Sequence, residues 1–472
     1  MLTTALAVRK PVRQTVLGKV AVAGALALSA LFPTLPGIAR PLQAQDVPAV
    51  LTLEDAIRLA RQNNPTYRQS LNDANVASIG VKQGWAAFLP SLSTSMGFNL
   101  SSNTSGTGEG DFGQPVENPD PITFRSSGAS QGANLNFTFF DGGAMFRRLS
   151  EARALERATD AQIVGAAATL EGQVTRDFYA ARRTRILVDV ELRNLATART
   201  RFEDTQQRFR IAAADQVDLL DAEQSVIRVE QQLATAEASA ATALLALRQT
   251  IGIDPGLSFE LAEVLPEVFD PTGLDADALV AVAVDRSPTV AQNRASLEAQ
   301  RYAVSAARGN RWPTISGGFG YSRSTSQQGY GAFGDFNPNS RYGWNFGVNV
   351  SLPIFQRFST TAQIAQAEAS REDAEYSLRS AQIEVERIVR EQLIELERLY
   401  RNFETQQRLA TLSEQQVTLA EDQYRLGARD FLQLQTIVDN NAEAQRQVVQ
   451  ARFDFVNALI TLEQTLGAPV ER

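Results

Sequence analysis

The sequence predicts an α+β membrane protein: a tandem-repeat chain that contributes four strands to an oligomeric transmembrane β-barrel and carries long coiled-coil helices. Three observations lead to this fold class. The chain is internally duplicated, four short segments alternate between apolar and small polar residues, and two long stretches contain no proline. Duplication over most of a chain sets the architecture before any single motif does.

The duplication divides the chain into two repeats, 51–252 and 274–467, joined by a proline-rich linker at 253–273. The repeats first align without a gap, so that Pro65 falls on Pro288. After a deletion in the second repeat they align at a constant offset of 215, as between Arg210 and Arg425. The deletion falls in a stretch rich in Gly, Ser and Asn at about 102–132, and this stretch and its counterpart at 324–340 are expected to be loops.

Composition excludes most catalytic chemistry. The chain contains no cysteine and no histidine, which removes thiolate and imidazole nucleophiles, histidine acid–base catalysis and the usual zinc sites. Only carboxylate catalysis remains, and no Asp/Glu pair lies in a recognisable catalytic setting. We therefore expect no enzyme activity, no catalytic residue, no cofactor and no metal site.

The first 44 residues are typical of a secretory signal peptide, with cleavage after Ala39 or Ala44. Four basic residues precede the apolar run Val20–Phe32, which is too short for a spanning helix of about 20 residues. Cleavage after Ala44 removes five basic residues and no acid, so the mature chain is more acidic than the net charge of −8 of the full sequence. An acidic exported chain is not expected to bind nucleic acid. Without a cysteine near the cleavage region, no lipid anchor is expected.

Strands are predicted at about 91–101, 133–140, 314–323 and 343–354, where apolar and polar residues alternate with a period of two. The polar positions are almost uncharged and consist of Ser, Gly and Asn, while aromatic residues gather at the apolar positions. This pattern favours a barrel with lipid outside and water inside over a soluble sandwich. Four strands cannot close a barrel, since about eight is the smallest workable number. Two, three or four copies of the chain would supply eight, twelve or sixteen strands.

The remaining sequence is predicted to be helical. Asn64 and Ser287 each precede a proline and are expected to cap a helix that begins there. Long helices follow from about 144 to 209 and from about 360 to 424, with sparse apolar stripes typical of coiled-coil packing. Each reverses at a short tip, 210–216 or 425–431, into a return helix that ends at a glycine.

In this order the motifs resemble the TolC-type outer-membrane efflux family, over about 51–470. The resemblance rests on the capped proline that starts a helix in each repeat, Pro90 and Pro313 at each change from helix to strand, the sequence Phe-Asp-Gly-Gly at 140–143, and Tyr-Arg-Leu-Gly-Ala-Arg at 424–429.

The resemblance implies a homotrimer with one twelve-stranded barrel in the outer membrane of a Gram-negative bacterium, and a periplasmic α-barrel built from the helices. It implies a duct of a tripartite efflux or type I secretion system that passes small toxic compounds or proteins to the exterior. Its expected partners are outer-membrane lipid, a periplasmic adaptor protein and an inner-membrane pump, driven by ATP (ABC type) or by protons. The alternative is a structural or adhesive outer-membrane protein with a coiled-coil stalk.

The resemblance also implies site residues at the hairpin tips. Asp218, Tyr424 and Arg429 match the positions that hold the periplasmic gate closed in the family. Gln433 and Thr436 depart from the acidic ring that some members place in the aperture. The alternative for the gate residues is an ordinary solvated helix end, where single charges contribute little. The expected adaptor-docking residues at the two tips are Arg210, Ala212, Asp215, Arg425, Gly427 and Asp430.

Overall fold

The computed structural model describes residues 48–109, 112, 114–212, 214–263, 267–328 and 340–470. This part of the chain divides into two compact units. One is a β-sheet unit made of residues 89–140 and 314–351, and the other is a helical unit made of the remaining described residues. The predicted signal peptide and its cleavage sites lie outside the described residues, as does most of the loop expected at 324–340.

The β-sheet unit is a four-stranded sheet in the order β2-β3-β5-β6. Pairing is antiparallel between β2 and β3 and between β5 and β6. In the middle of the sheet Gly132 faces the carbonyl of Tyr321 and Gly128 faces that of Thr325, so β3 and β5 also run in opposite directions. The order therefore leaves β2 and β6 at the two edges. The strand bounds are β2 (Ser91–Glu109), β3 (Pro115–Asp141), β5 (Thr314–Gln328) and β6 (Arg341–Ser351).

The expectation of a loop at 102–132 was wrong for most of its length, because β2 runs on to Glu109 and β3 begins at Pro115. Small polar residues form this extension by bonding across the strands. The hydroxyls of Ser101 and Ser126 lie 2.7 Å apart, and those of Thr104 and Thr123 lie 3.0 Å apart. Such cross-strand pairs stabilise an antiparallel ribbon. The loop composition was therefore a poor guide here.

The last predicted strand, 343–354, ends earlier than expected, at Ser351. Proline lacks the N–H that a strand pair needs, and Pro353 follows two residues later. Every residue of β6 is exposed. Trp344, Phe346 and Val348 alternate with Asn and Gly, so one exposed face of this strand is apolar.

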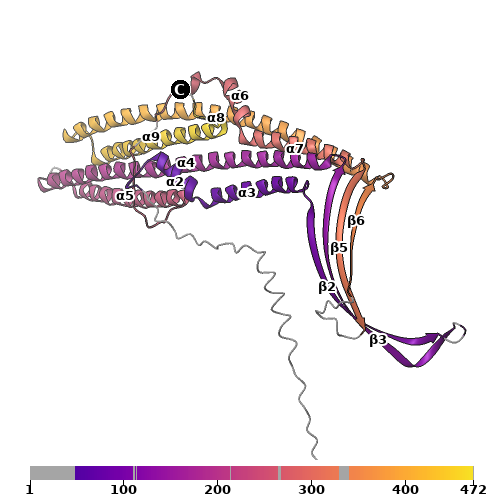
Figure 1. Ribbon diagram of the computed structural model, residues 1–472. Helices are drawn as coiled ribbons and strands as arrows, with labels where there is room; N and C mark the ends of the chain where they lie inside the picture. Colours follow the sequence, from indigo (N-terminus) through magenta and orange to yellow (C-terminus); the bar gives the residue numbers. More distant parts are fainter. Residues whose placement is uncertain are drawn as a thin grey trace, which may run out of the picture. The chain divides into compact units, whose positions relative to one another are not determined.

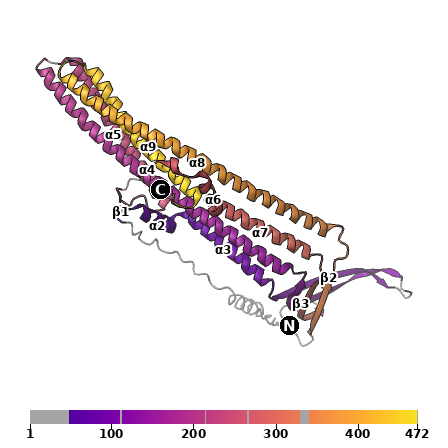
Figure 2. The ribbon, with the colours of Figure 1, turned by 90° about the horizontal axis from the view of Figure 1, so that it is seen from above.

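The helical unit is built around a row of four long helices in the order α5-α4-α9-α8 (Figure 1). Their bounds are α4 (Ala144–Arg210), α5 (Gln216–Ile251), α8 (Ser359–Arg425) and α9 (Phe431–Leu466). Helices α4 and α8 have 67 residues each, and α5 and α9 have 36 each. At 1.5 Å per residue α4 is about 100 Å long. The long helices run alongside one another in both views (Figure 2).

Four shorter helices precede the strands, two in each repeat. They are α2 (Leu53–Asn63), α3 (Pro65–Ala86), α6 (Ala276–Arg286) and α7 (Pro288–Gly309). The capping side chains that the sequence predicts are formed: the Asn64 side chain accepts from the Tyr67 amide at 3.0 Å, and the Ser287 hydroxyl accepts from the Val290 amide at 3.5 Å. Among the described residues no helix is long and apolar enough to cross a membrane.

Each repeat has its own apolar core, and side chains of the linker pack against both cores. Phe259 packs in the core of the first repeat, while Val268 and Phe269 pack against that of the second. A two-residue parallel pair between β1 (Val50–Leu51) and β4 (Glu260–Leu261) fastens the linker near its start. Tyr179 of α4 contacts both cores, with its ring 5.7 Å from that of Phe178 and 6.4 Å from that of Phe453.

Gly172 allows the two repeats to interlock. It is buried in α4 where the Gln464 side chain crosses from α9. The Gln464 amide donates to the Ala168 carbonyl at 3.1 Å and accepts from Arg176 at 2.6 Å. A methyl group at Gly172 would overlap this amide. The glycine is therefore part of the contact between the repeats.

We expect Gly172→Ala to destabilise the folded chain by roughly 1–3 kcal/mol, because displacement of Gln464 leaves its buried partners unsatisfied. The gain in helix propensity of about 1 kcal/mol is smaller. Gly80→Ala is the matched control, since Gly80 lies in α3 with open space around it, and it should stabilise the chain by about 0.5–1 kcal/mol. Unfolding followed by circular dichroism compares the stability of the two variants. Equal stabilisation by both substitutions would contradict the contact between Gly172 and Gln464.

Candidate functional site

The two hairpin tips are short turns with the same construction. The first lies between Arg210 and Gln216 and the second between Arg425 and Phe431. Ala212 has a φ of 58° and its counterpart Gly427 has a φ of 75°. A left-handed conformation is unstrained for glycine but costs about 1–2 kcal/mol for other residues. The backbone of the first tip is therefore strained at Ala212, whereas the backbone of the second tip is not strained at Gly427.

Aspartate side chains begin the return helix at both tips. The Asp215 carboxylate accepts from the Asp218 amide at 2.8 Å, and the Asp218 carboxylate accepts from the Asp215 amide at 3.4 Å. This reciprocal pair is a capping box, in which each side chain satisfies an otherwise free backbone donor. Asp430 likewise accepts from the Gln433 amide at 2.7 Å. The predicted docking residues Asp215 and Asp430 thus have a structural role as helix caps.

The predicted gate residues have separate partners within the described chain. Asp218 is bonded at its own tip, and Arg429 donates to the side chain of Gln423 at 3.0 Å. The Tyr424 ring lies under the guanidinium of Arg208, 4.6 Å from the ring centre. These contacts do not join the three residues to one another. A contact of Asp218 with Tyr424 or Arg429 in a neighbouring copy stays a prediction.

Arg208 is a tip residue that the sequence analysis missed. It connects α4 of the first hairpin to α8 of the second, since its guanidinium also donates to the Tyr424 carbonyl at 3.4 Å. Two turns further from the tip, Arg201 pairs with Glu421 at 2.7 Å, and the two side chains are 15% and 32% exposed. These residues and Phe431 line a cavity of about 340 Å³. The only sequence signal was their position in the last turns before each tip.

Negative charge accumulates at the tips. Burial raises the pKa of the Asp218 carboxyl, and the carboxylates of Asp215, Asp221 and Asp430 raise it further, against the hydrogen bond from the Asp215 amide. The contribution of Asp430 reflects the proximity of the second tip to the first. Neighbouring like charges disfavour the ionised form. Ionised Asp218 is therefore a source of repulsion between the two tips.

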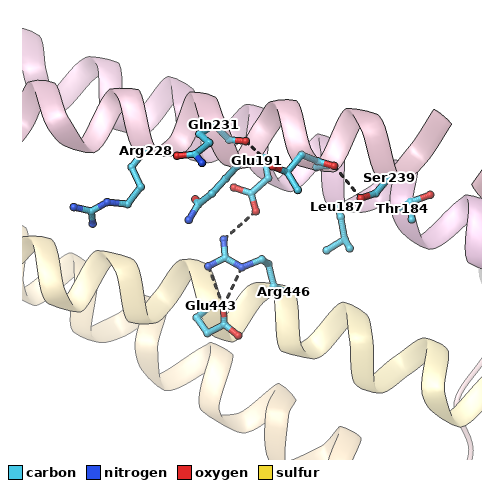
Figure 3. A pocket seen from close by; sticks show the side chains of 11 residues that line it. Thr184, Leu187, Glu191, Arg228, Gln231, Ser239, Glu443 and Arg446 are labelled. Atoms are coloured by element: carbon cyan, nitrogen blue, oxygen red, sulfur yellow. Dashed lines mark hydrogen bonds and ion pairs between the residues drawn. The ribbon is translucent and has the colours of Figure 1, made fainter. Parts of the chain in front are cut away.

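A second polar cluster lies further along the row, where α4, α5 and α9 surround a cavity of about 560 Å³. Figure 3 shows Glu191 of α4 and Arg446 of α9 pointing toward each other, with Glu443 beside them. The Glu191 carboxylate accepts from Arg446 at 2.9 Å and from Asn194 at 3.1 Å. Its side chain is 4% exposed and that of Arg446 is 27% exposed. Both carboxylate oxygens of this buried acid are satisfied, as burial of a charge requires.

Further polar pairs connect the two hairpins on either side of this cluster. Arg183 of α4 donates to Gln450 of α9 at 3.0 Å, and Arg228 of α5 pairs with Asp439 of α9 at 3.2 Å. We call the contact between α4 and α9 the α4–α9 seam.

Within the described residues no group of three or more His, Cys, Asp or Glu side chains could hold a metal ion.

The fold of the chain is similar to the folds of solved outer-membrane channels. The structure of the CmeC outer membrane channel of Campylobacter jejuni matches with a TM-score of 0.70 at 16% identity, over 88% of this chain and 85% of that one. The outer membrane efflux protein family model matches residues 56–253 and 279–468. The chain belongs to this family.

Two sequence relatives illustrate the range of the family. The chain is similar to protein CyaE of Bordetella pertussis, at 27% identity over 69% of this chain and 65% of the relative. It is also similar to the outer membrane protein TolC of Vibrio cholerae, at 20% identity over 89% of this chain and 91% of the relative. The family match covers both repeats and all four long helices.

We expect Glu191→Gln to destabilise the chain by roughly 3 kcal/mol. The substitution removes the negative charge that faces the partly buried guanidinium of Arg446 and replaces it with a neutral amide, which is a weaker partner. Adding Arg446→Gln should recover most of the loss, since the orphaned charge is then removed. Glu395→Gln in the exposed Glu395–Arg398 pair of α8 is the control, and it should change stability by less than about 1 kcal/mol. Denaturant unfolding measures the stability of all three variants. If the double variant were as unstable as Glu191→Gln alone, the loss of stability would not come from the unpaired charge of Arg446.

The raised pKa of Asp218 gives the tip a pH dependence of known sign. A raised folded-state pKa means that the native tip binds a proton more tightly than the unfolded chain, so the stabilisation by protonation is present at low pH and is lost as the pH rises through the raised pKa. We therefore expect slower amide exchange at 214–222, after correction for intrinsic rates, as the pH falls from neutrality through that pKa. Asp218→Asn should remove this dependence, and Asp73→Asn on α3 should leave it unchanged. The reverse trend in the native chain would contradict the repulsion.

Proposed function

We propose that the chain is the outer-membrane duct of a tripartite efflux or type I secretion system in a Gram-negative bacterium. Membership of the outer membrane efflux protein family carries this proposal. The fold supports it, since a four-stranded sheet and a long row of helices are the parts from which a membrane pore and a tunnel can be built. The cargo passes without covalent chemistry.

We infer that three copies assemble into one twelve-stranded barrel. In lipid every backbone donor and acceptor must be paired, so spanning strands occur in closed barrels. The edge strands β2 and β6 therefore need partner strands. A neighbouring copy can supply its β6 as the partner of β2, and its β2 as the partner of β6. The exposed apolar residues of β6 would then contact the outer-membrane lipid. Three copies agree with the resemblance to trimeric family members.

The helices would form a tunnel on the periplasmic side. The tip of each hairpin lies about 100 Å along α4 or α8 from the first residue of that helix, a reach suited to crossing much of the periplasm. There an adaptor protein, which couples the duct to an inner-membrane pump, would bind the tips. Exposed Ile211 and its counterpart Leu426 add an apolar contact to the docking residues that the sequence predicts.

The tips would also close the tunnel. Within each copy the contact of Arg208 with Tyr424 holds the two hairpins together, and across copies Asp218 would meet Tyr424 and Arg429. Each such contact is weak, but several copies around one ring act on the same opening. Binding of an adaptor to the tips would compete with these contacts.

We expect Arg208→Gln with Tyr424→Leu to raise the open probability of the pore by about ten- to a hundredfold, since a cation–π contact of about 0.5–1 kcal/mol is lost in each of three copies. Tyr424→Phe with Arg429→Ser keeps the ring under Arg208 and tests only the contacts between copies. Arg398→Gln, in mid-helix, is the control. Single-channel recording in planar bilayers measures conductance, and native mass spectrometry establishes the trimer.

Unchanged conductance of both double variants in intact trimers would place the constriction elsewhere. Intact trimers of the native chain that conduct no ions under any condition would contradict the duct and favour a stalk. A stable monomer in mild detergent would contradict the shared barrel.

A further inference from the structure

A cavity of about 810 Å³ lies between the first long hairpin and the beginning of the linker, away from the tips. Helices α4 and α5 form one side of this cavity, and β4 with its neighbouring residues forms the other. Its volume is in the range of sites that hold small ligands. We call it the linker cavity.

The floor of the linker cavity is apolar and consists mainly of small side chains. Ala181 of α4 is buried, and Ala240 and Leu244 of α5 are half-buried beside it. The ring of Phe259, from the linker, lines the cavity as well. A molecule that enters the cavity therefore meets aliphatic and aromatic surface, and an apolar body gains most from contact with it.

The second repeat shows which groups fill the corresponding space. Because α4 and α8 have equal lengths, as do α5 and α9, the offset of 215 relates every residue of one hairpin to a residue of the other. Three alanines of the cavity have larger counterparts: Ala181 corresponds to Leu396, Ala240 to Phe455 and Ala241 to Val456. All three counterparts are buried in the core of the second repeat.

Aromatic rings complete the packing in the second repeat. The ring of Phe269, from the linker, lies edge-on to that of Phe455 with 5.7 Å between their centres, and the Tyr400 ring lies 6.2 Å from Phe455. In the first repeat the position of Tyr400 is taken by Arg185 and that of Phe455 by Ala240. The linker cavity therefore lies where the second repeat is filled with rings, and its shape favours an aromatic ligand.

Two arginines of α4 line the cavity beside this apolar floor. Arg182 and Arg185 are three residues apart, so they lie on the same face of the helix. The Arg182 side chain is 11% exposed, and its Nε is buried without a hydrogen-bond partner in the described part of the chain. Its guanidinium pairs at 3.3 Å with Glu263, whose side chain is 86% exposed. The second repeat has Glu397 at the position of Arg182, so the two cations occur in the first repeat alone.

Carboxylates also line the cavity, but they lie at its edge. Glu237, Glu260 and Glu263 are all exposed. Exposed charges contribute little to an ionic contact because water screens them. Arg182 is largely buried, so its interaction with a charged ligand is screened less. The charge of the ligand is therefore set by the arginines, and it is negative.

We propose that the linker cavity binds a small aromatic carboxylate. Its ring lies on the alanine floor, and its carboxylate bonds to Arg182 and Arg185 and displaces Glu263. Arginine forms strong charge-assisted hydrogen bonds with carboxylates, often two at once. Such a ligand contacts α4, α5 and the linker together. The site does not depend on the duct function proposed above, because it is measured by binding and not by transport.

Titration calorimetry with naphthalene-2-carboxylate, on the full chain in lipid nanodiscs, tests the site. Ala240→Phe introduces the side chain of the second repeat and fills the cavity, so we expect the Kd to rise about tenfold or more. Ala238→Phe is the matched control, since position 238 is exposed on the same helix and does not line the cavity. It should change the Kd by less than about twofold. Circular dichroism checks that both variants are folded.

The arginines are tested with a charged and a neutral compound of the same shape. Arg182→Gln with Arg185→Gln should raise the Kd of naphthalene-2-carboxylate about tenfold or more, and change that of naphthalene-2-methanol by less than about twofold. Arg193→Gln, at an exposed position of α4 outside the cavity, is the control. Equal affinity of the native chain for the acid and the alcohol would overturn the carboxylate ligand. Absence of binding at millimolar concentration, or binding that survives Ala240→Phe, would overturn the site.

Discussion

The contact between α4 and α9 is the interaction that joins the two long hairpins of the helical unit. Each repeat folds a hairpin around its own apolar core, and the two hairpins meet along this seam. Tyr179 reaches both cores, Gly172 admits Gln464, and Glu191 is buried against Arg446. The fit of Gln464 at Gly172 and the buried Glu191–Arg446 ion pair favour one relative register of the hairpins, because a slip by one turn would leave Glu191 buried without its partner.

Beyond the cores, the surfaces of the long helices carry many ion pairs between residues of the same helix. Many arginines pair with carboxylates on the helix surface, for example Arg387 with Glu384 and Arg398 with Glu395, and such exposed pairs contribute little each. Stability is therefore concentrated near the cores and decreases toward the tips. This distribution agrees with the gate proposed at the tips, since mobile elements come from the less stable parts of a fold.

The tips combine two opposing effects. Arg208 and Arg201 hold the two hairpins together through Tyr424 and Glu421, while the carboxylates of Asp218 and Asp430 repel. In the gate proposed for the tips, a balance between attraction and repulsion could be shifted by a ligand of modest differential affinity. An adaptor that neutralises the acidic side chains or competes for Tyr424 would suffice.

The sequence by itself determined the repeats, the helix starts at Pro65 and Pro288, and the long helices and their tips. These follow from local chemistry: capping side chains, the absence of proline, and apolar periodicity. It could not determine how far β2 and β3 extend, because Ser and Thr are typical both of loops and of strands whose hydroxyls bond across the ribbon. It also gave the tip positions without their partners.

Only the tertiary structure decided which charged residues meet. Glu191 and Arg446 are distant in sequence and resemble other surface charges until the helices pack. Likewise, nothing in the sequence around Arg208 indicates that it contacts Tyr424. The local sequence determines where each helix begins and ends, because backbone preferences act within a few residues. Pairing between helices depends on their register, and that is decided where the two repeats come into contact.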